Sequence, residues 1–338
     1  MRMARIWGPA IAVLSILLVA TVAHPTHANA ADDNFAEGQF DKTLKVTGPV
    51  NLTVDTGSGS ISVRPGDGST VHVIGRIRVH EGWGMSDAAA KDKVRKLEAN
   101  PPIVQEGNTI HVGEIRDEEL RRNVSISYEV VTPAETQLHS STGSGSQMVE
   151  GVRGPVEATT GSGSINGSKI GNEMRASTGS GTITLEDIKG SVRATTGSGG
   201  IRATGIAGGL SGRTGSGTVE YEQTAPGDVD IETGSGGIEL RGVHGGVHAR
   251  AGSGHITVDG TPTGDWRLHT GSGGVTMKLP PNAGFELDAS TGSGSVSITP
   301  EHELTVSGTI NRHELRGKAH GGGPLIYAST SSGSIRVE

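Results

Sequence analysis

Residues 160–201 read TGSGSINGSKIGNEMRASTGSGTITLEDIKGSVRATTGSGGI, and in this stretch the tetrapeptide Thr-Gly-Ser-Gly returns every 18 residues. Full copies begin at Thr56, Thr142, Thr160, Thr178, Thr196, Thr214, Thr233, Thr270 and Thr291. Two degenerate copies, each with one substitution, begin at Ala251 (AGSG) and Thr330 (TSSG). A fixed short period is typical of a solenoid, in which each repeat is one coil that buries its apolar face against its neighbours.

The residues before each tetrapeptide alternate between apolar and polar. If the threonine is position zero, positions −4, −2 and 0 read Val156, Ala158 and Thr160 in one coil. This alternation predicts a strand with one buried face, on which intervening residues such as Arg193 face water. Because the threonine column points inward, we expect its members to hydrogen-bond along the stack.

The residues after each tetrapeptide predict a second strand. Position +5 is an aliphatic residue in most coils, as at Ile165, Ile183 and Ile201. Gln147 breaks this column beside Met148, which predicts a one-residue slip there. Both strands can bury one face only if the chain bends between them, and the two glycines permit the positive φ angles of such a corner. The sequence thus predicts an all-β, right-handed parallel β-solenoid, with about 18 residues and two strands per coil.

A stretch without the repeat, residues 64–135, predicts a small α+β insert near the N-terminus. We expect a strand over 70–80, a helix over 86–99 capped by Ser86, a hairpin over 103–112 and a strand over 124–130. The insert is expected to cap or flank the first coil, because a solenoid end exposes unpaired backbone. Residues 31–63 then hold the first coil, and residues 136–338 the β-solenoid repeats. Residues 299–324 also lack the period and are expected to form a protruding loop.

The first 30 residues have the pattern of a signal peptide. Arg2 and Arg5 precede an apolar run over 10–23, and Ala28-Asn29-Ala30 fits the small-x-small cleavage pattern. The run is shorter than a membrane-spanning helix requires, although an uncleaved anchor is an alternative. We therefore expect export to the periplasm, the outer surface or the medium, with no integral membrane segment after cleavage.

Composition narrows the class of partner. The 338 residues include 55 Gly and no Cys, and the formal net charge is −7. Without cysteine no disulfide can form, so stability must come from the stacked coils. The acidic balance gives no reason to expect a nucleic acid partner.

Motifs for catalysis and cofactors are weak. The histidines between 244 and 269 lie among arginines and fit no zinc spacing, and no Gly-rich segment reads G-x-G-x-x-G before a helix. The serines recur equally in every coil, whereas a catalytic serine should be singular. We expect no enzyme activity, no metal and no cofactor.

Two surfaces are candidates for binding. His248 and Arg267 at position −3, with Arg250 and His269 at position −1, are expected to form a small basic patch on adjacent outward strands. Thr184, Thr257 and Thr276 belong to the outer face of the second strand, which is small and neutral and is predicted to be a flat Ser/Thr surface. For both surfaces the plainer interpretation is a solvated β face.

Three segments carry a resemblance to a known family. They are Val131-Thr132-Pro133-Ala134-Glu135-Thr136, the serial TGSG units, and the ending GGGPLIYASTSSGSIRVE over 321–338. With them the chain resembles, over about 40–338, the auto-transporter adhesin-like, β-strand-repeat proteins of bacteria, a family of unknown function. The resemblance implies a right-handed parallel β-solenoid that is exported from a bacterial cell, and it carries over no catalytic residue.

The function that these observations favour is binding. We expect an exported, non-catalytic, adhesin-like solenoid that holds an envelope or extracellular polymer or protein through its β faces. A β-helix enzyme acting on polysaccharide and a structural spacer of the cell envelope are the alternatives.

Overall fold

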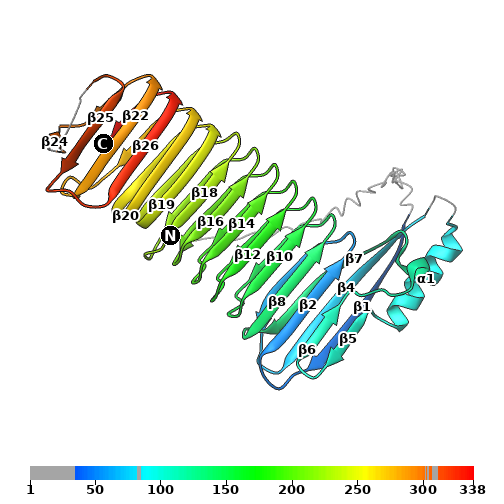
Figure 1. Cartoon of the computed structure of the whole chain (residues 1–338). Coiled ribbons are helices and arrows are strands. Elements are labelled where there is room, and N and C mark those ends of the chain that lie inside the picture. The colour runs from blue at the N-terminus through cyan, green and yellow to red at the C-terminus, as the bar shows by residue number, and fades with distance from the viewer. Residues whose placement is uncertain (1–34, 82–84, 301, 303, 307–310) are drawn as a thin grey trace, which may run out of the picture. The chain divides into compact units, whose positions relative to one another are not determined.

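The computed structural model describes residues 35–81, 85–300, 302, 304–306 and 311–338. In these residues the unit Phe35–Glu338 forms 27 strands, which belong to one sheet, and two helices (Figure 1). The predicted all-β, solenoid-like fold is confirmed. The predicted signal peptide, residues 1–30, lies outside the described residues.

The strands that end at the corner threonines pair with one another in parallel. Val156 pairs with Met174, which pairs with Val192, and all three are buried. The charged residues between buried positions, such as Arg175, face outward. These strands are β2 (Val50–Thr56), β8 (Thr136–Thr142), β10 (Val156–Thr160), β12 (Met174–Thr178), β14 (Val192–Thr196), β16 (Leu210–Thr214), β18 (Val229–Thr233), β22 (Phe285–Ser293) and β26 (Leu325–Ser332).

The strands after the corners form a second parallel series. Ile165, Ile183 and Ile201 are consecutive partners, and each is at most 1% exposed. These strands are β3 (Ile61–Gly66), β9 (Gln147–Glu150), β11 (Ile165–Ser168), β13 (Ile183–Glu186), β15 (Ile201–Ile206), β17 (Val219–Gln223), β21 (Val275–Lys278), β23 (Val296–Ile298) and β27 (Ile335–Val337). The long strands β19 (Ile238–Ser253) and β20 (Ile256–Ser272) pass through the return corner, so each contributes to both series.

The return corner contains a further apolar column that the sequence pattern did not reveal. Val152, Ile170, Ile188, Ile206 and Val243, at position +10, are fully buried. The residue before each of them has a positive φ. These residues are Gly151, Lys169, Asp187, Gly205 and Gly242. The left-handed conformation turns the chain so that the +10 side chain enters the core.

The tetrapeptide glycines are required for close approach of the coils, and the prediction that they need positive φ is wrong for most of them. A Cβ atom at Gly163 would lie 1.8 Å from the carbonyl oxygen of Gly145 in the neighbouring coil. Among the corner glycines of the described residues, only Gly294 and Gly333 have a positive φ in the region that disfavours side chains. Stacking at strand spacing leaves no room for a side chain between successive corners.

Each corner threonine from Thr142 onward donates its hydroxyl to a glycine carbonyl of the neighbouring coil, and Thr56, in the first coil, donates to the carbonyl oxygen of Ile126. Thr178 Oγ1 donates to the carbonyl oxygen of Gly163 at 2.8 Å and accepts the N–H of Gly181 at 3.1 Å. The expected hydrogen bonding along the stack is present, with a backbone acceptor in place of the next threonine. Equivalent bonds to the neighbouring coil come from Thr142, Thr160, Thr196, Thr214, Thr233, Thr270, Thr291 and Thr330.

Gln147 keeps the register of its column, and the predicted slip is wrong. Gln147 pairs with Ile165 and is fully buried, whereas Met148 is 55% exposed. Ser140 Oγ donates to Gln147 Oε1 at 2.5 Å, and Gln147 Nε2 donates to the carbonyl oxygen of Thr159 at 2.5 Å. A buried amide is tolerated here because nearby groups satisfy it.

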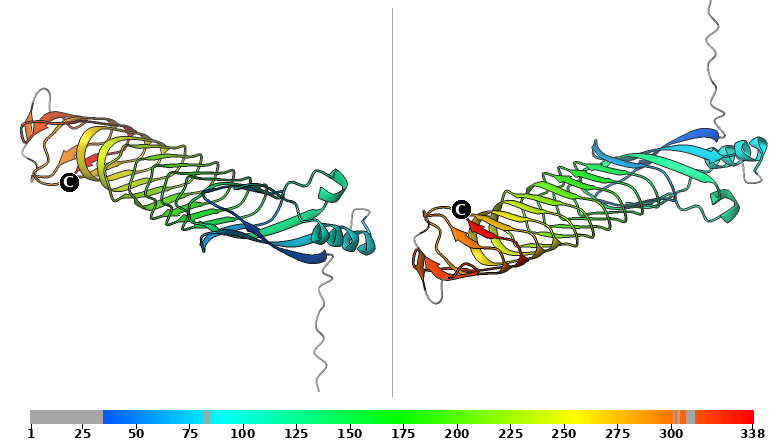
Figure 2. Two further views of the ribbon diagram at one scale, coloured as in Figure 1. Left: turned by 90° about the horizontal axis from the view of Figure 1, so that it is seen from below. Right: turned by 90° about the horizontal axis from the view of Figure 1, so that it is seen from above.

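The N-terminal end of the stack is covered by the insert. Its elements are β4 (Thr70–His80), α1 (Asp87–Ala99), β5 (Ile103–Glu106), β6 (Thr109–Val112), α2 (Glu118–Arg121) and β7 (Val124–Pro133), preceded by β1 (Phe35–Lys45). β6 continues the sheet in parallel beside β2, and β7 does so beside β3. In both views of Figure 2 the insert, in cyan, lies at one end of the stack. Ser86 caps α1 by accepting the N–H of Ala89, and β5 and β6 form the expected hairpin.

The C-terminal end differs from the sequence order. β26 lies between β20 and β22, since Ala328 pairs with both Leu268 and Ala289. The last coil of the sequence is therefore inserted one place inside the end of the stack (Figure 1). The prediction that residues 299–324 form a protruding loop is wrong for their described part. β25 (Glu314–Ala319) pairs antiparallel with the outer edge of β22, and β24 (Leu304–Val306) pairs with β25, which satisfies backbone that the end coil would expose.

Candidate functional site: an open trough across six coils

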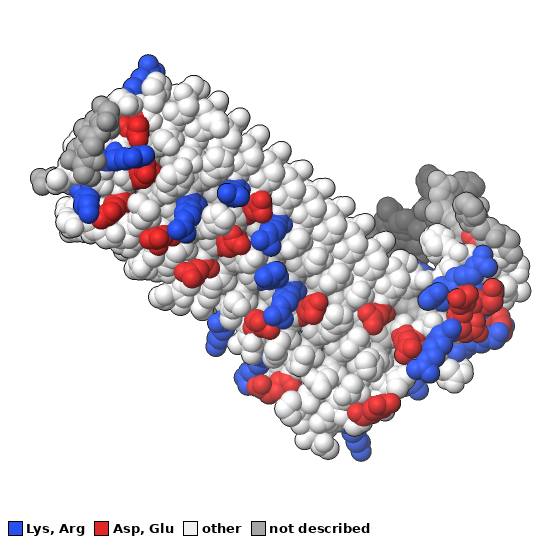
Figure 3. Space-filling view, viewed as in Figure 1, with Lys and Arg blue, Asp and Glu red and all other residues white. Residues whose placement is uncertain are grey.

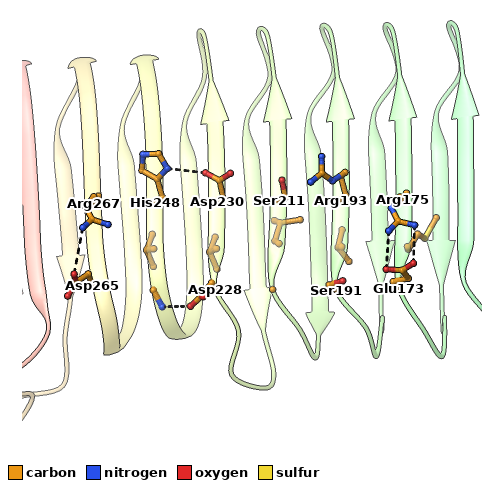
Figure 4. Close-up of a pocket in the computed structure, with 17 residues that line it drawn as sticks. Glu173, Arg175, Ser191, Arg193, Ser211, Asp228, Asp230, His248, Asp265 and Arg267 are labelled. Carbon is orange, nitrogen blue, oxygen red and sulfur yellow. Dashed lines mark hydrogen bonds and ion pairs between the residues drawn. The ribbon is translucent and has the colours of Figure 1, made fainter.

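An elongated hollow of about 500 Å³ crosses the outer face of six successive coils. Its sides come from positions −3 and −5 of six coils, which lie in or directly before β12, β14, β16, β18, β19 and β20. We call this hollow the trough (Figure 4). Position −5 supplies Glu173, Ser191, Gly209, Asp228, Gly246 and Asp265. Position −3 supplies Arg175, Arg193, Ser211, Asp230, His248 and Arg267.

The parallel register explains why these side chains form two rows. Each position −3 residue pairs with the position −3 residue of the next coil, as Arg193 does with Ser211. The aliphatic residues at position −4, such as Val192 and Leu210, point into the core and force their neighbours outward. A mixed band of acidic and basic side chains therefore runs across the stack (Figure 3).

Two arginine–carboxylate ion pairs and one histidine–carboxylate contact lie in the trough. Arg175 of β12 pairs in bidentate fashion with Glu173, which directly precedes this strand, with N–O distances of 2.9 and 3.2 Å. His248 Nδ1 lies 3.1 Å from Asp230 Oδ1 of the neighbouring coil. Arg267 Nη2 lies 3.7 Å from Asp265 Oδ2. These pairs neutralise most of the local charge (Figure 4).

Two charged side chains of the trough lack an ionic partner. In the described residues no carboxylate lies within 4.0 Å of the guanidinium of Arg193, and no cationic group lies within 4.0 Å of the carboxylate of Asp228. Asp228 Oδ1 accepts the backbone N–H of Gly246 at 2.8 Å. Both side chains are exposed, so they are free to meet a ligand.

The predicted basic residues lie on neighbouring strands. His248 pairs with Arg267, and Arg250 pairs with His269. His248 and Arg267 line the trough, whereas His269 Nδ1 is 2.8 Å from Ser329 Oγ outside it. The patch is less basic than the sequence indicated, because aspartates pair with His248 and Arg267.

The predicted threonines are only partly brought together. Thr257 pairs with Thr276, and His255 Nε2 lies 3.1 Å from the hydroxyl of Thr276. Thr184 lies four coils away on the same series of strands. The intervening positions hold Arg202, Glu220 and Glu239, of which the first two form an ion pair at 2.8 Å. The outer face of the second strands is therefore not a continuous Ser/Thr surface.

An exposed aromatic side chain adjoins one end of the trough. Tyr327 of β26 pairs with Arg267 and is 41% exposed, and Leu325 beside it is 39% exposed. The sequence pattern predicted that Arg193 faces outward, but it did not indicate that Tyr327 lies beside Arg267. Its coil is inserted out of sequence order, so no repeat period could have indicated this neighbour.

The groups whose acidity is altered by burial lie outside the trough. Burial raises the pKa of the carboxyl group of Asp55 and of the phenols of Tyr128 and Tyr221. The hydroxyl of Tyr221 donates to the carbonyl oxygen of Gly208, as a structural group would. In the described residues, no three His, Cys, Asp or Glu side chains converge as a metal site. Neither described helix has the length and apolar character needed to cross a bilayer.

Comparison with known proteins gives one family match. Residues 207–338 match the model of the family described as Toastrack DUF4097. The matched residues include the C-terminal segment 321–338, one of the three segments on which the predicted family resemblance was based. The resemblance to the auto-transporter adhesin-like family stays a prediction. No curated protein sequence matches the chain.

The solved structures that match the chain have low sequence identity and low TM-scores. A candidate cell adhesion protein from Clostridium sporogenes ATCC 15579 is 12% identical, with a TM-score of 0.19 and coverage of 89% of this chain and 99% of that one. A candidate lipid binding protein from Parabacteroides distasonis ATCC 8503 is 14% identical, with a TM-score of 0.40 and coverage of 89% and 96%. A candidate adhesin from Bacteroides fragilis NCTC 9343 is 14% identical, with a TM-score of 0.27 and coverage of 89% and 97%.

Proposed function

We propose that the protein is an exported, non-catalytic binding protein with an adhesin-like role. It holds a polymer or protein of the cell envelope or extracellular space against the outer face of its coils. The observation that carries this proposal is the trough, which crosses six coils and stays open along its length. We also propose that the coils wind with a right hand, as the crossover rule for parallel strands predicts.

The dimensions of the trough favour an extended ligand. Six coils at a spacing of about 4.8 Å extend for about 24 Å between the first and last strand. Sites for small molecules usually enclose most of the ligand surface. An open trough instead suits a chain that lies across the strands and contacts successive coils. Tyr327 and Leu325 would extend the contact beyond Arg267.

The chemistry of the trough supports binding over catalysis. Glycoside cleavage requires one carboxyl group that remains protonated, usually in an apolar surrounding, and a second that is ionised. Asp228 and Asp230, at positions −5 and −3 of one coil, are two neighbouring carboxylates of the trough. Asp230 faces His248 and Arg213, and Asp228 accepts a backbone N–H, so neither has an apolar surrounding.

Two variants test whether the ligand binds in the trough or on the outer face of the strands that follow the corners. Ser211→Tyr places a ring in the centre of the trough, and Thr184→Tyr places the same ring on the second strands, at an equally half-buried outward position. The full exported chain is sedimented with insoluble envelope material, and bound protein is measured against concentration. We expect saturable binding that Ser211→Tyr weakens at least tenfold and Thr184→Tyr leaves unchanged.

The other outcomes identify the alternatives. Equal binding by both variants and the parent would exclude the trough as the binding face. Release of reducing ends from a polysaccharide would favour an enzyme. Absence of saturable binding to any envelope fraction would favour a structural spacer.

A further inference from the structure

The two uncompensated charges of the trough have opposite sign. Arg193 is cationic and Asp228 is anionic, and every other charged side chain that lines the trough faces an opposite charge within the described residues. Arg175 is already satisfied by Glu173, so Arg193 is the guanidinium available to a ligand. Asp228 uses Oδ1 for the N–H of Gly246, and its Oδ2 has no partner among the described residues.

The surface between these two charges is low and open. Gly209, just before β16, and Ser211 of β16 lie between β14, which carries Arg193, and the coil that holds Asp228 just before β18. A Cβ atom at Gly209 would lie 2.4 Å from the backbone oxygen of Asp228, so this position cannot hold a side chain without local movement. Because Gly209 has no side chain and Ser211 has a short one, a ligand in the trough can approach the backbone here and reach the hydroxyl of Ser211.

The separation of the two charges sets the size of the ligand. Arg193 and Asp228 are two coils apart, about 10 Å along the stack, and offset by two residues along the strand direction, about 7 Å, so their Cα atoms are about 12 Å apart. The long side chain of Arg193 can cover part of this distance. An extended tripeptide spans about 10 Å from its ammonium to its carboxylate, at about 3.3–3.6 Å per residue. Arginine binds carboxylate through two parallel hydrogen bonds, and aspartate accepts hydrogen bonds from an ammonium group.

We propose that the trough binds a zwitterionic peptide segment about three residues long, with its carboxylate on Arg193 and its ammonium on Asp228. This inference rests on the proposed function and specifies the chemistry of the polymer, which would carry short peptide branches that present one free carboxylate and one free ammonium group. A polyanion is disfavoured, because Asp228 and Asp230 follow Arg193 within two coils. The peptide backbone would cross Gly209 and Ser211.

The test uses tri-alanine as the probe and the full exported chain as the receptor. Binding is followed by the amide chemical shifts of Gly209 and Ser211 in solution NMR. Single alanine, N-acetyl-tri-alanine and tri-alanine amide are the comparison ligands. Because exposed ion pairs contribute up to about 1 kcal/mol, each blocked terminus should weaken binding about twofold to fivefold. Single alanine cannot reach both charges and should bind more weakly than tri-alanine.

Variants assign each terminus to its residue. In Arg193→Gln, tri-alanine and its amide should bind equally, whereas the penalty for N-acetylation should persist. In Asp228→Asn the reverse should hold. Arg250→Gln is the matched control, since Arg250 is an exposed arginine on the same face that does not line the trough. It should leave all four affinities unchanged.

The proposal is overturned if the blocked peptides bind as tightly as tri-alanine, or if Arg250→Gln acts like Arg193→Gln. The envelope sedimentation assay separates this failure from failure of the proposed function. If Ser211→Tyr still removes polymer binding while tri-alanine shows no terminus dependence, the trough binds a polymer of another chemistry. If neither ligand responds to Ser211→Tyr, both proposals fail.

Discussion

Ala251 pairs with Thr233 at the corner of the neighbouring coil, and it is the one member of the inward corner column, within the described residues, that lacks a hydroxyl group. Thr233 donates to the carbonyl oxygen of Gly217, and Thr270, on the other side of Ala251, donates to Gly254. By the same geometry a hydroxyl at position 251 would reach the carbonyl oxygen of Gly236. The column therefore has one missing hydrogen bond, at a site that is 2% exposed.

Ala251→Thr should stabilise the protein. The new hydroxyl would donate to Gly236, and threonine also suits a strand better than alanine, so we expect a gain of about 0.5–1.5 kcal/mol. Urea unfolding followed by circular dichroism measures the change. Ala249→Thr is the control, because Ala249 is fully buried between Ile231 and Leu268 at position −2. It should destabilise the protein by overpacking, and a gain there would contradict the explanation.

Thr178→Val should destabilise the protein although it conserves shape. The substitution removes the donor to Gly163 and the acceptor for Gly181, and leaves both backbone groups without that partner. The expected cost is about 1–3 kcal/mol, with faster hydrogen exchange at the amide of Gly181. Thr178→Ser retains the hydroxyl and should cost less. Thr195→Val, at an exposed position of β14, should change stability by less than about 0.5 kcal/mol.

Two glycines of the same motif should differ in their tolerance of alanine. A Cβ at Gly163 meets the carbonyl oxygen of Gly145 at 1.8 Å, whereas a Cβ at Gly57 meets no atom within 4 Å. Gly163→Ala must push two coils apart, and we expect a loss above about 3 kcal/mol in unfolding free energy. Gly57→Ala should be neutral or stabilising by up to about 1 kcal/mol, because it restricts the unfolded chain. Equal effects would show that the glycines serve the corner conformation and not the stacking.

The fold could be predicted because the repeat fixes which side chains are buried. Val156, Ala158 and Thr160 alternate with polar residues, and the same spacing recurs in coil after coil. The inward columns of the strands before and after each corner could therefore be predicted from the sequence. The column that includes Ile170 was not found, since it follows a positive-φ residue that is lysine in this coil and aspartate in the next. Lysine does not signal a left-handed conformation, and aspartate, although enriched in it, occupies this position in only one of these coils.

The spatial order of the last coils could not be predicted from the repeat pattern. Positions −4, −2 and 0 of β22 and β26 are equally apolar, so either strand could pair with β20. The choice depends on the antiparallel addition of β25, whose partner is β22.

The candidate site could be predicted from the sequence only in part. His248 and Arg267 were recognised by their charge, whereas the trough depends on Gly209 and Ser211, whose small size is a property of the packed surface.

Asp55 should make stability depend on pH in the acid range. Burial raises the pKa of its carboxyl group above the ordinary value of 3.8, so the folded state keeps the proton to a higher pH than the unfolded state. Its contribution to stability is therefore present below pH 3.8 and is lost as the pH rises through the folded pKa. Asp55→Asn should gain stability over the parent between pH 3.5 and pH 7, as measured by urea unfolding. A difference between variant and parent that is the same at both pH values would contradict this assignment.

The buried pair formed by Ser140 and Gln147 should be replaceable only as a unit. Other coils have alanine and isoleucine at these positions, as at Ala158 and Ile165. Gln147→Ile alone removes the acceptor for Ser140 Oγ, and Ser140→Ala alone removes the donor to Gln147 Oε1. Each single change should cost about 1–3 kcal/mol, because one buried polar group is left without its partner. The double variant restores the apolar column and should lie within about 1 kcal/mol of the parent, which gives a coupling energy that urea unfolding of all four proteins measures. Additive single effects would mean that the amide and hydroxyl contribute independently, and that backbone partners such as the carbonyl oxygen of Thr159 dominate.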